Sequence, residues 1–171
     1  MGVFWLAVDK DYSSYLELKY RKVVAQGWGG VGDLVSLKPF HPKHEDLFIQ
    51  NIQVLGDIAY KDADWWKNKD REKSRCPTVM HNLMGLKEGD LIVATEGQTV
   101  KGICKMPSNG LDSYRLDKGF SYAQTVGFSA KWIDIDSFEF TPNPGKIPFG
   151  IHNVVNDRER VIKAWEAYQN S

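Results

Sequence analysis

LKEGDLIVATEGQTVKGICKM, residues 86–106, is the stretch of sequence that best predicts the fold. Its two halves, LIVAT and TVKGICKM, are rich in apolar and β-branched residues, and the break EGQ separates them. Two such runs joined by a short glycine-containing break are typical of a β-hairpin. The piece TVMHNLMGL, which follows Pro77, is expected to be a short helix that leads through Gly89 and Asp90 into the first strand.

Toward the N-terminus, the pattern predicts a strand followed by two helices. The apolar run VFWLAV, residues 3–8, ends at the polar DKD as a buried strand would. Ser13 or Ser14 offers an N-cap for a helix through SYLELKYRKVV, residues 14–24. A second, amphipathic helix is expected to begin after Pro42, with an apolar face made of Phe48, Ile52, Leu55 and Ala59.

The mixed-charge run KDADWWKNKDREKSR, residues 61–75, has no steady apolar period. It is therefore expected to be a solvated helix or an exposed loop. Trp65 and Trp66 are the exceptions, and we expect one of them to pack inward and the other to lie on the surface.

Toward the C-terminus, residues 107–119 are rich in turn formers and predict a loop. Strands are expected in YAQTVGFSAKWIDID and in FEF, before an irregular stretch that holds three prolines at 142, 144 and 148. Asn156 or Asp157 can cap a final helix. Helices first and consecutive strands later favour one α+β domain over residues 1–171, with a largely antiparallel, curved and partly closed sheet flanked by helices.

Composition narrows the class of protein. The chain has 171 residues, of which 42% are hydrophobic, so it can bury a substantial core. No apolar run approaches the roughly 20 residues that span a bilayer, and Asp9 interrupts the first segment before it could act as a signal peptide. We therefore expect a cytoplasmic or nuclear protein.

The cysteines and histidines do not predict a metal centre. Cys76 and Cys104 are the only cysteines, and outside a secreted context we expect two buried, reduced thiols. His41 and His44 stand close together, but zinc ligands normally come in tight pairs and neither cysteine has a close partner. We expect no metal and no cofactor.

The segment AQGWGGVGD contains Gly27, Gly29 and Gly32 in the spacing G-x-G-x-x-G. In dinucleotide-binding proteins a helix begins inside this motif and holds the pyrophosphate at its N-terminus. Here Pro39 and Pro42 follow too closely for a crossover helix, and Trp28 crowds the turn. Nicotinamide or flavin binding is therefore not expected.

The same segment, extended to VVAQGWGGVGDL, resembles the region after the first helix in EVE and YTH-like domains of the PUA superfamily. The strand FWLAV, the hairpin of residues 86–106 and the late strand VGFSAKWIDI occur in the order of that family. The resemblance covers residues 3–135 and includes the N-terminal modules of restriction proteins of the McrB type. It implies a PUA-like fold that reads modified bases.

The resemblance also implies site residues. Trp28 corresponds to a wall of the ligand pocket, and the backbones of Gly27 and Gly29 can approach a base. Polar residues after the first strand read the base edge in such domains, and this chain has Asp9, Lys10, Asp11 and Tyr12 there. For a second aromatic wall, the chain offers Tyr114, Phe120 and Tyr122.

The chemistry of a nucleobase agrees with these residues. A base has two flat faces and a polar edge, so its site needs aromatic walls and a few fixed hydrogen-bonding groups. We therefore expect a module that binds a flipped or unpaired, modified base, such as a methylated one, in DNA or RNA. The expected partner is a nuclease or NTPase subunit, either fused or associated. Binding to a membrane is not expected.

Basic residues are too evenly mixed with acids to predict a strong phosphate-binding face. The 22 basic residues balance the 22 acidic ones, so binding must depend on a pocket rather than on many phosphates. The candidate phosphate contacts are Lys69, Arg71, Lys73, Arg75, Arg115 and Lys118, although the interleaved acids favour a solvated face for these residues.

Two other functions stay open. Some ASCH-like relatives in the PUA superfamily are hydrolases, and Lys101, Thr95 and Glu96 could form such a site here. No arrangement of nucleophile and base stands out in the sequence, so a non-catalytic protein is expected. The third alternative is a protein-interaction domain with a vestigial pocket.

Overall fold

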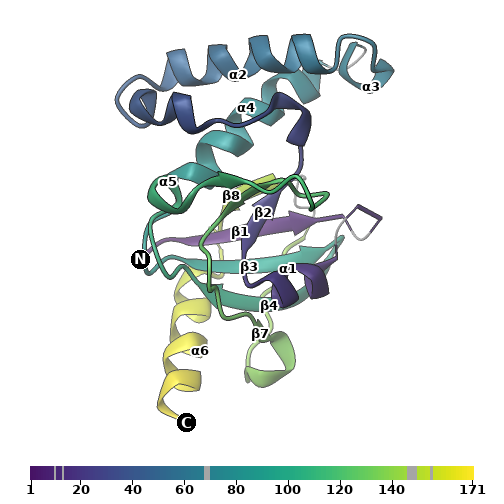
Figure 1. The fold of residues 1–171 in the computed structure, drawn as a ribbon. Helices are drawn as coiled ribbons and strands as arrows, with labels where there is room; N and C mark the ends of the chain where they lie inside the picture. The colour runs from purple at the N-terminus through teal and green to yellow at the C-terminus, as the bar shows by residue number, and fades with distance from the viewer. Residues whose placement is uncertain (10, 13, 68–69, 146–149, 155) are drawn as a thin grey trace.

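The computed structural model describes residues 1–9, 11–12, 14–67, 70–145, 150–154 and 156–171, without the side chains of residues 70–74. It has an α+β architecture with two sheets (Figure 1). The strands are β1 (Val3–Val8), β2 (Val24–Gln26), β3 (Leu91–Glu96), β4 (Thr99–Lys105), β5 (Arg115–Leu116), β6 (Gln124–Val126), β7 (Ile133–Asp134) and β8 (Gly150–Asn153). The α-helices are α1 (Tyr15–Arg21), α2 (Glu45–Ala59), α3 (Asp64–Lys67), α4 (Asp70–Gly85), α5 (Gly110–Ser113) and α6 (Arg158–Asn170).

The predicted hairpin forms the centre of the larger sheet, whose order is β7-β4-β3-β1-β8. Strands β3 and β4 pair antiparallel up to Glu96 and Thr99, so only Gly97 and Gln98 make the turn. Gly97 has a φ of 60°, which glycine adopts without steric cost. Strand β1 pairs parallel with β3, and the other pairs in this sheet are antiparallel.

The smaller sheet has the order β2-β6-β5. We expected one curved, partly closed sheet, but the structure has two sheets and neither is closed. Both edges of β1 are already paired, one with β3 and the other with β8. Strand β2 therefore cannot pair with β1, and its Gln26 side chain instead donates to the carbonyl oxygen of Ala7 at 3.4 Å.

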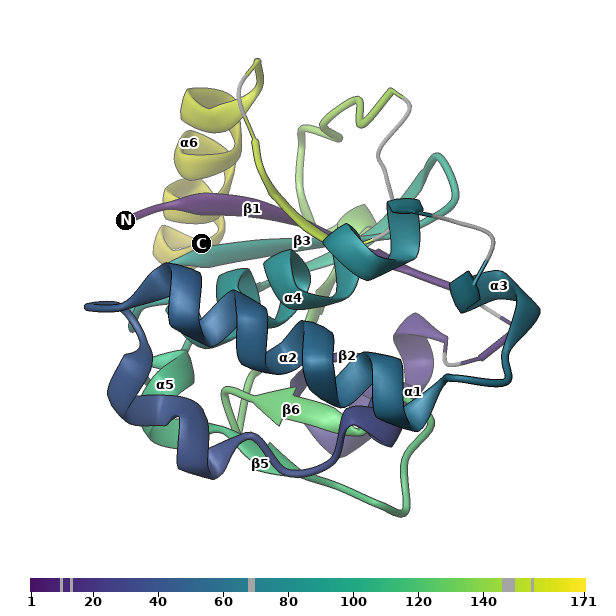
Figure 2. The same cartoon turned by 90° about the horizontal axis from the view of Figure 1, so that it is seen from above.

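Apolar side chains pack on both faces of the larger sheet. Leu6 and Ile92 face a cluster that includes residues of α2, α4 and β2. Trp5 and Val93 face the opposite cluster, which includes Trp165 of α6. Figures 1 and 2 show α2 and α4 on one side of this sheet and α6 on the other.

The GD turn before β3 anchors the N-terminus. The Asp90 carboxylate accepts hydrogen bonds from the backbone N–H of Gly2 at 2.6 Å and of Lys87 at 2.8 Å. Burial of a charged group requires such partners. Strand β4 requires glycine at position 102. A Cβ at Gly102 would collide with the Tyr15 hydroxyl and lie 2.5 Å from the Ile133 carbonyl oxygen.

Several boundaries differ from the sequence-based expectations. The first helix ends at Arg21 because Lys22 is left-handed, with a φ of 55°, and the buried residues that follow form β2. Helix α4 begins at Asp70 and includes Pro77, rather than starting after it. The predicted loop of residues 107–119 contains α5 and β5. The predicted strand FEF is wrong, because no strand is assigned there and a 3-10 turn precedes it.

Other expectations are confirmed. Helix α2 follows Pro42 with Glu45 and Asp46 in its first turn, and Asp157 is the N-cap of α6. Trp66 is buried and Trp65 is 43% exposed. Cys76 and Cys104 are buried thiols that take part in no disulfide. Among the described residues, no helix combines the length and the apolar character that crossing a membrane requires.

Candidate functional site

The glycine-rich segment forms a tight turn at the end of β2. Trp28 adopts a left-handed backbone conformation with a φ of 56°, and residues Gly29–Val31 make a single 3-10 turn rather than a crossover helix. This conformation is unusual for a bulky residue and costs about 1–2 kcal/mol. The Trp28 ring is partly buried against the core. Strain of this kind persists only where the surroundings impose it, and it concentrates at functional sites.

Gln124, on β6, holds this turn from inside the protein. Its side-chain N–H groups donate to the carbonyl oxygens of Trp28 at 3.2 Å and of Gly32 at 3.1 Å. Its own carbonyl oxygen accepts from the Tyr114 hydroxyl at 2.5 Å, and that hydroxyl accepts from the Leu34 N–H at 3.0 Å. Burial raises the pKa of Tyr114 to about 12, so the hydroxyl stays protonated and the network stays intact at neutral pH.

Tyr60, at the end of α2, covers the other side of the turn. Its hydroxyl accepts the Gly30 N–H at 2.9 Å, and a Cβ at Gly30 would lie 2.8 Å from its ring. A Cβ at Gly29 would lie 2.8 Å from that of Ala123. The glycines therefore let the turn pass between two packed surfaces. Trp65 continues this surface outward, with its ring centroid 4.9 Å from that of Tyr60.

The end of β1 lies beside the same turn. The Asp9 N–H donates to the Tyr122 hydroxyl at 2.6 Å, and the Tyr122 ring is the side chain nearest to where a Cβ at Gly27 would be, at 3.9 Å. Burial also raises the pKa of Tyr122. The Asp9 carboxylate accepts the Asp11 N–H at 3.0 Å, at the start of the loop that follows β1. Tyr12, in that loop, is 71% exposed.

The structure thus brings the sequence-predicted base-binding residues into one neighbourhood, with different exposures. Trp28, Gly27, Gly29 and Asp9 lie at a partly exposed surface. Tyr114 and Tyr122 are buried at 4% and 2% exposure, as is Phe120. Their rings therefore support the turn from the core, and no flat face of theirs is open to solvent.

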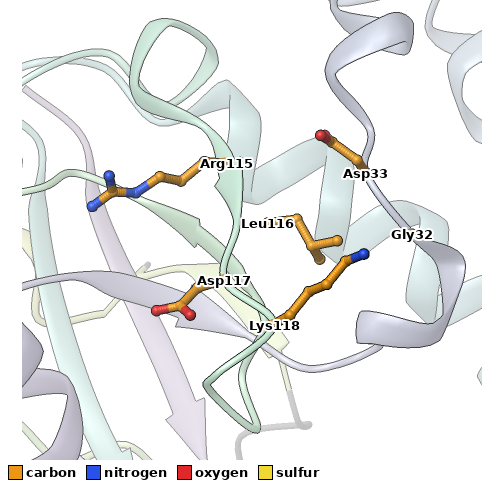
Figure 3. Close-up of a pocket in the computed structure, with 6 residues that line it drawn as sticks. All are labelled: Gly32, Asp33, Arg115, Leu116, Asp117 and Lys118. Carbon is orange, nitrogen blue, oxygen red and sulfur yellow. The ribbon is translucent and has the colours of Figure 1, made fainter.

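A groove of about 660 Å³ lies on the far side of the turn, between Gly32–Asp33 and Arg115–Lys118 (Figure 3). Lys118, Leu116 and Asp33 turn toward this groove, whereas Arg115 turns away. The Arg115 guanidinium lies over the Phe128 ring at 3.1 Å from its centroid. Both predicted phosphate contacts line the groove, but of the two only Lys118 turns its side chain toward it.

The other predicted phosphate contacts give little support for a phosphate-binding site. Lys69 lies outside the described residues, as do the side chains of Arg71 and Lys73. Arg75 is partly buried.

The residues of the hydrolase alternative lie around the β3–β4 hairpin. The Lys101 ammonium is 3.4 Å from one Glu96 oxygen, and the other Glu96 oxygen accepts the Tyr15 N–H at 2.8 Å. The Tyr15 contact anchors α1 to the sheet, whereas the Lys101–Glu96 pair joins β4 to β3. Thr95 is fully buried, and its hydroxyl has no hydrogen-bond partner among the described residues.

Two residues of the site were not identified from the sequence. Gln124 is the polar residue within the apolar strand YAQTV, which was a readable signal for a buried anchor. Tyr60 carries no such signal, because only the tertiary fold places it on Gly30. Comparison with protein-family models, curated proteins and solved structures found no match.

Proposed function

We propose that this protein is a nucleic-acid-binding module that holds a flipped or unpaired, modified base at the Trp28 turn. The observation that carries the proposal is the strained backbone of Trp28, which Gln124 and Tyr60 hold in place from two sides. Such strain would serve a function if it holds the Trp28 ring at a position where a flat ligand can stack on it. Stacking on one aromatic ring contributes about 1–3 kcal/mol per base.

The surroundings of the turn fit the rest of a base. Backbone groups of Gly27 and Gly29 are close to the surface, and the polar residues Asp9 and Tyr12 follow β1 nearby.

We further propose that the α+β fold is of the PUA-like kind, related to EVE and YTH-like domains. The order of strand, glycine-rich turn, GD turn and hairpin supports this assignment. On this proposal the protein works in the cytoplasm or nucleus on modified DNA or RNA, together with a nuclease or NTPase subunit.

A binding screen tests the function directly. Short DNA and RNA oligonucleotides, each with one methylated base or its unmodified counterpart, are titrated against the protein. We expect binding that depends on the single modified base. Turnover of N-acyl nucleosides instead would favour the hydrolase, for which the proximity of Lys101 and Glu96 is the one supporting observation.

Salt dependence should be shallow. Three basic side chains of the described residues are already engaged: Lys19 pairs with Asp134, Arg21 pairs with Asp117, and Arg115 covers Phe128. Each phosphate contact to a single strand contributes a slope of about −0.7 in a plot of log K against log salt concentration. We therefore expect weak binding of unmodified strands, with a total slope of about −1 to −2.

Titrations at several salt concentrations measure this slope. Lys118→Gln is expected to make it shallower by about 0.7. Tight, salt-resistant binding to an unmodified duplex would contradict this account of the surface.

A further inference from the structure

Trp65 is an exposed aromatic residue that is connected to the Trp28 turn through Tyr60. Its side chain is 43% exposed, unlike the buried Tyr114, Phe120 and Tyr122. Contacts connect it to the turn in two steps, because Tyr60 bonds the Gly30 N–H at 2.9 Å and the Tyr60 and Trp65 rings are 4.9 Å apart. Figures 1 and 2 both show α3 at the same end of the molecule as the segment that follows β1.

The Trp65 ring is held in place before any ligand arrives. Tyr60 packs against it at an interplanar angle of 53°, and Trp66 meets it edge-on at 89° with 5.9 Å between centroids. Trp66 is itself fixed by a hydrogen bond from its indole N–H to Asp57 at 2.8 Å. A ring that is already ordered loses little conformational freedom on binding, so stacking on it is more favourable.

Tyr60 lies between Trp65 and the Trp28 turn, and this arrangement limits which part of a ligand Trp65 can contact. The Tyr60 ring touches Gly30 on one side and Trp65 on another. In this chain of contacts the Tyr60 ring lies between Gly30 and Trp65, so we expect a base on Trp65 to be a different one from the base held at Trp28. A neighbouring nucleotide on the same strand offers such a second flat face.

We propose that Trp65 stacks the base next to the one held at Trp28, so that the ligand is a strand of at least two unstacked nucleotides. This inference rests on the proposed function. The charges around Trp65 support stacking rather than phosphate binding, because Lys61 and Lys67 are balanced by Asp62 and Asp64, which lie between them along the chain. Lys67 lies 3.9 Å from Asp62.

The test compares a mononucleotide with a trinucleotide that has the same base at its centre, both carrying the modification found in the screen. Trp65→Ala is expected to weaken trinucleotide binding about three- to tenfold and to leave mononucleotide binding unchanged. Trp65→Phe should restore most of the loss. In nuclear magnetic resonance spectra, the Trp65 indole N–H signal should shift with the trinucleotide and not with the mononucleotide.

Tyr20→Ala is the matched control, because Tyr20 is 86% exposed on α1 and has no place in the site. If Trp65→Ala leaves trinucleotide binding unchanged while Trp28→Ala weakens both ligands, the inference on Trp65 fails and the proposed function stands. Equal weakening of both ligands by Trp65→Ala would also overturn the inference, because Trp65 would then contact the same base. If the wild-type protein binds neither ligand, the proposed function fails as well.

Discussion

Trp66→Ala is expected to lower the free energy of unfolding by about 3–5 kcal/mol, as truncation of a buried tryptophan does. The Trp66 side chain is 1% exposed, and its ring fills the space above Gly56, where no larger side chain would fit. Its loss would leave a cavity and would also leave the Asp57 carboxylate without the indole donor. In a chain of this size, the melting temperature should fall by about 6–20 °C.

Circular dichroism melts measure this effect, with Trp65→Ala as the adjacent control. Because Trp65 is 43% exposed, its truncation should lower the free energy of unfolding clearly less than that of Trp66. A Trp66→Ala protein that melts within a degree or two of the wild type would show that α3 is not packed on α2 in this way.

Trp28→Ala is expected to weaken binding of a modified oligonucleotide by about 1–3 kcal/mol, which is about five- to 150-fold in Kd. The ring is only partly buried, so the domain should stay folded. The backbone strain provides a second variant. Trp28→Gly removes the same ring but tolerates the left-handed conformation, so it should lose the same affinity and be more stable than Trp28→Ala.

Titrations and thermal melts of both variants distinguish a wall of the site from a core residue. A fall in stability of about 3–5 kcal/mol would indicate a core tryptophan. Unchanged affinity for the best oligonucleotide would remove Trp28 from the site, and the assignment of Gly27 and Gly29 would fail with it.

Local sequence patterns predicted a secondary-structure element correctly where the sequence signal for that element was unambiguous. The hairpin of residues 91–105 combines two apolar runs with a glycine at the turn, and the amphipathic period of α2 is regular. Strand β2 was missed because it is only three residues long and continues an apolar helical pattern. Strand β8 was missed because it follows a proline-rich stretch, and only its pairing with β1 orders it.

The site was predictable in part for the same reason. The glycines around Trp28 mark a turn on their own, and Asp9 follows an obvious strand. The exposure of an aromatic ring depends on what packs over it from elsewhere in the chain. Sequence alone therefore could not separate the buried Tyr114 and Tyr122 from the exposed Trp65.

The most direct test of base recognition is a titration with three single strands that differ at one nucleotide. The first carries the modified base found in the screen, the second its unmodified counterpart, and the third an abasic sugar at that position. We predict that the modified strand binds most tightly and that the abasic strand loses about five- to 150-fold in affinity. Equal affinity for all three strands would contradict the account, because the protein would then bind the backbone and not a base.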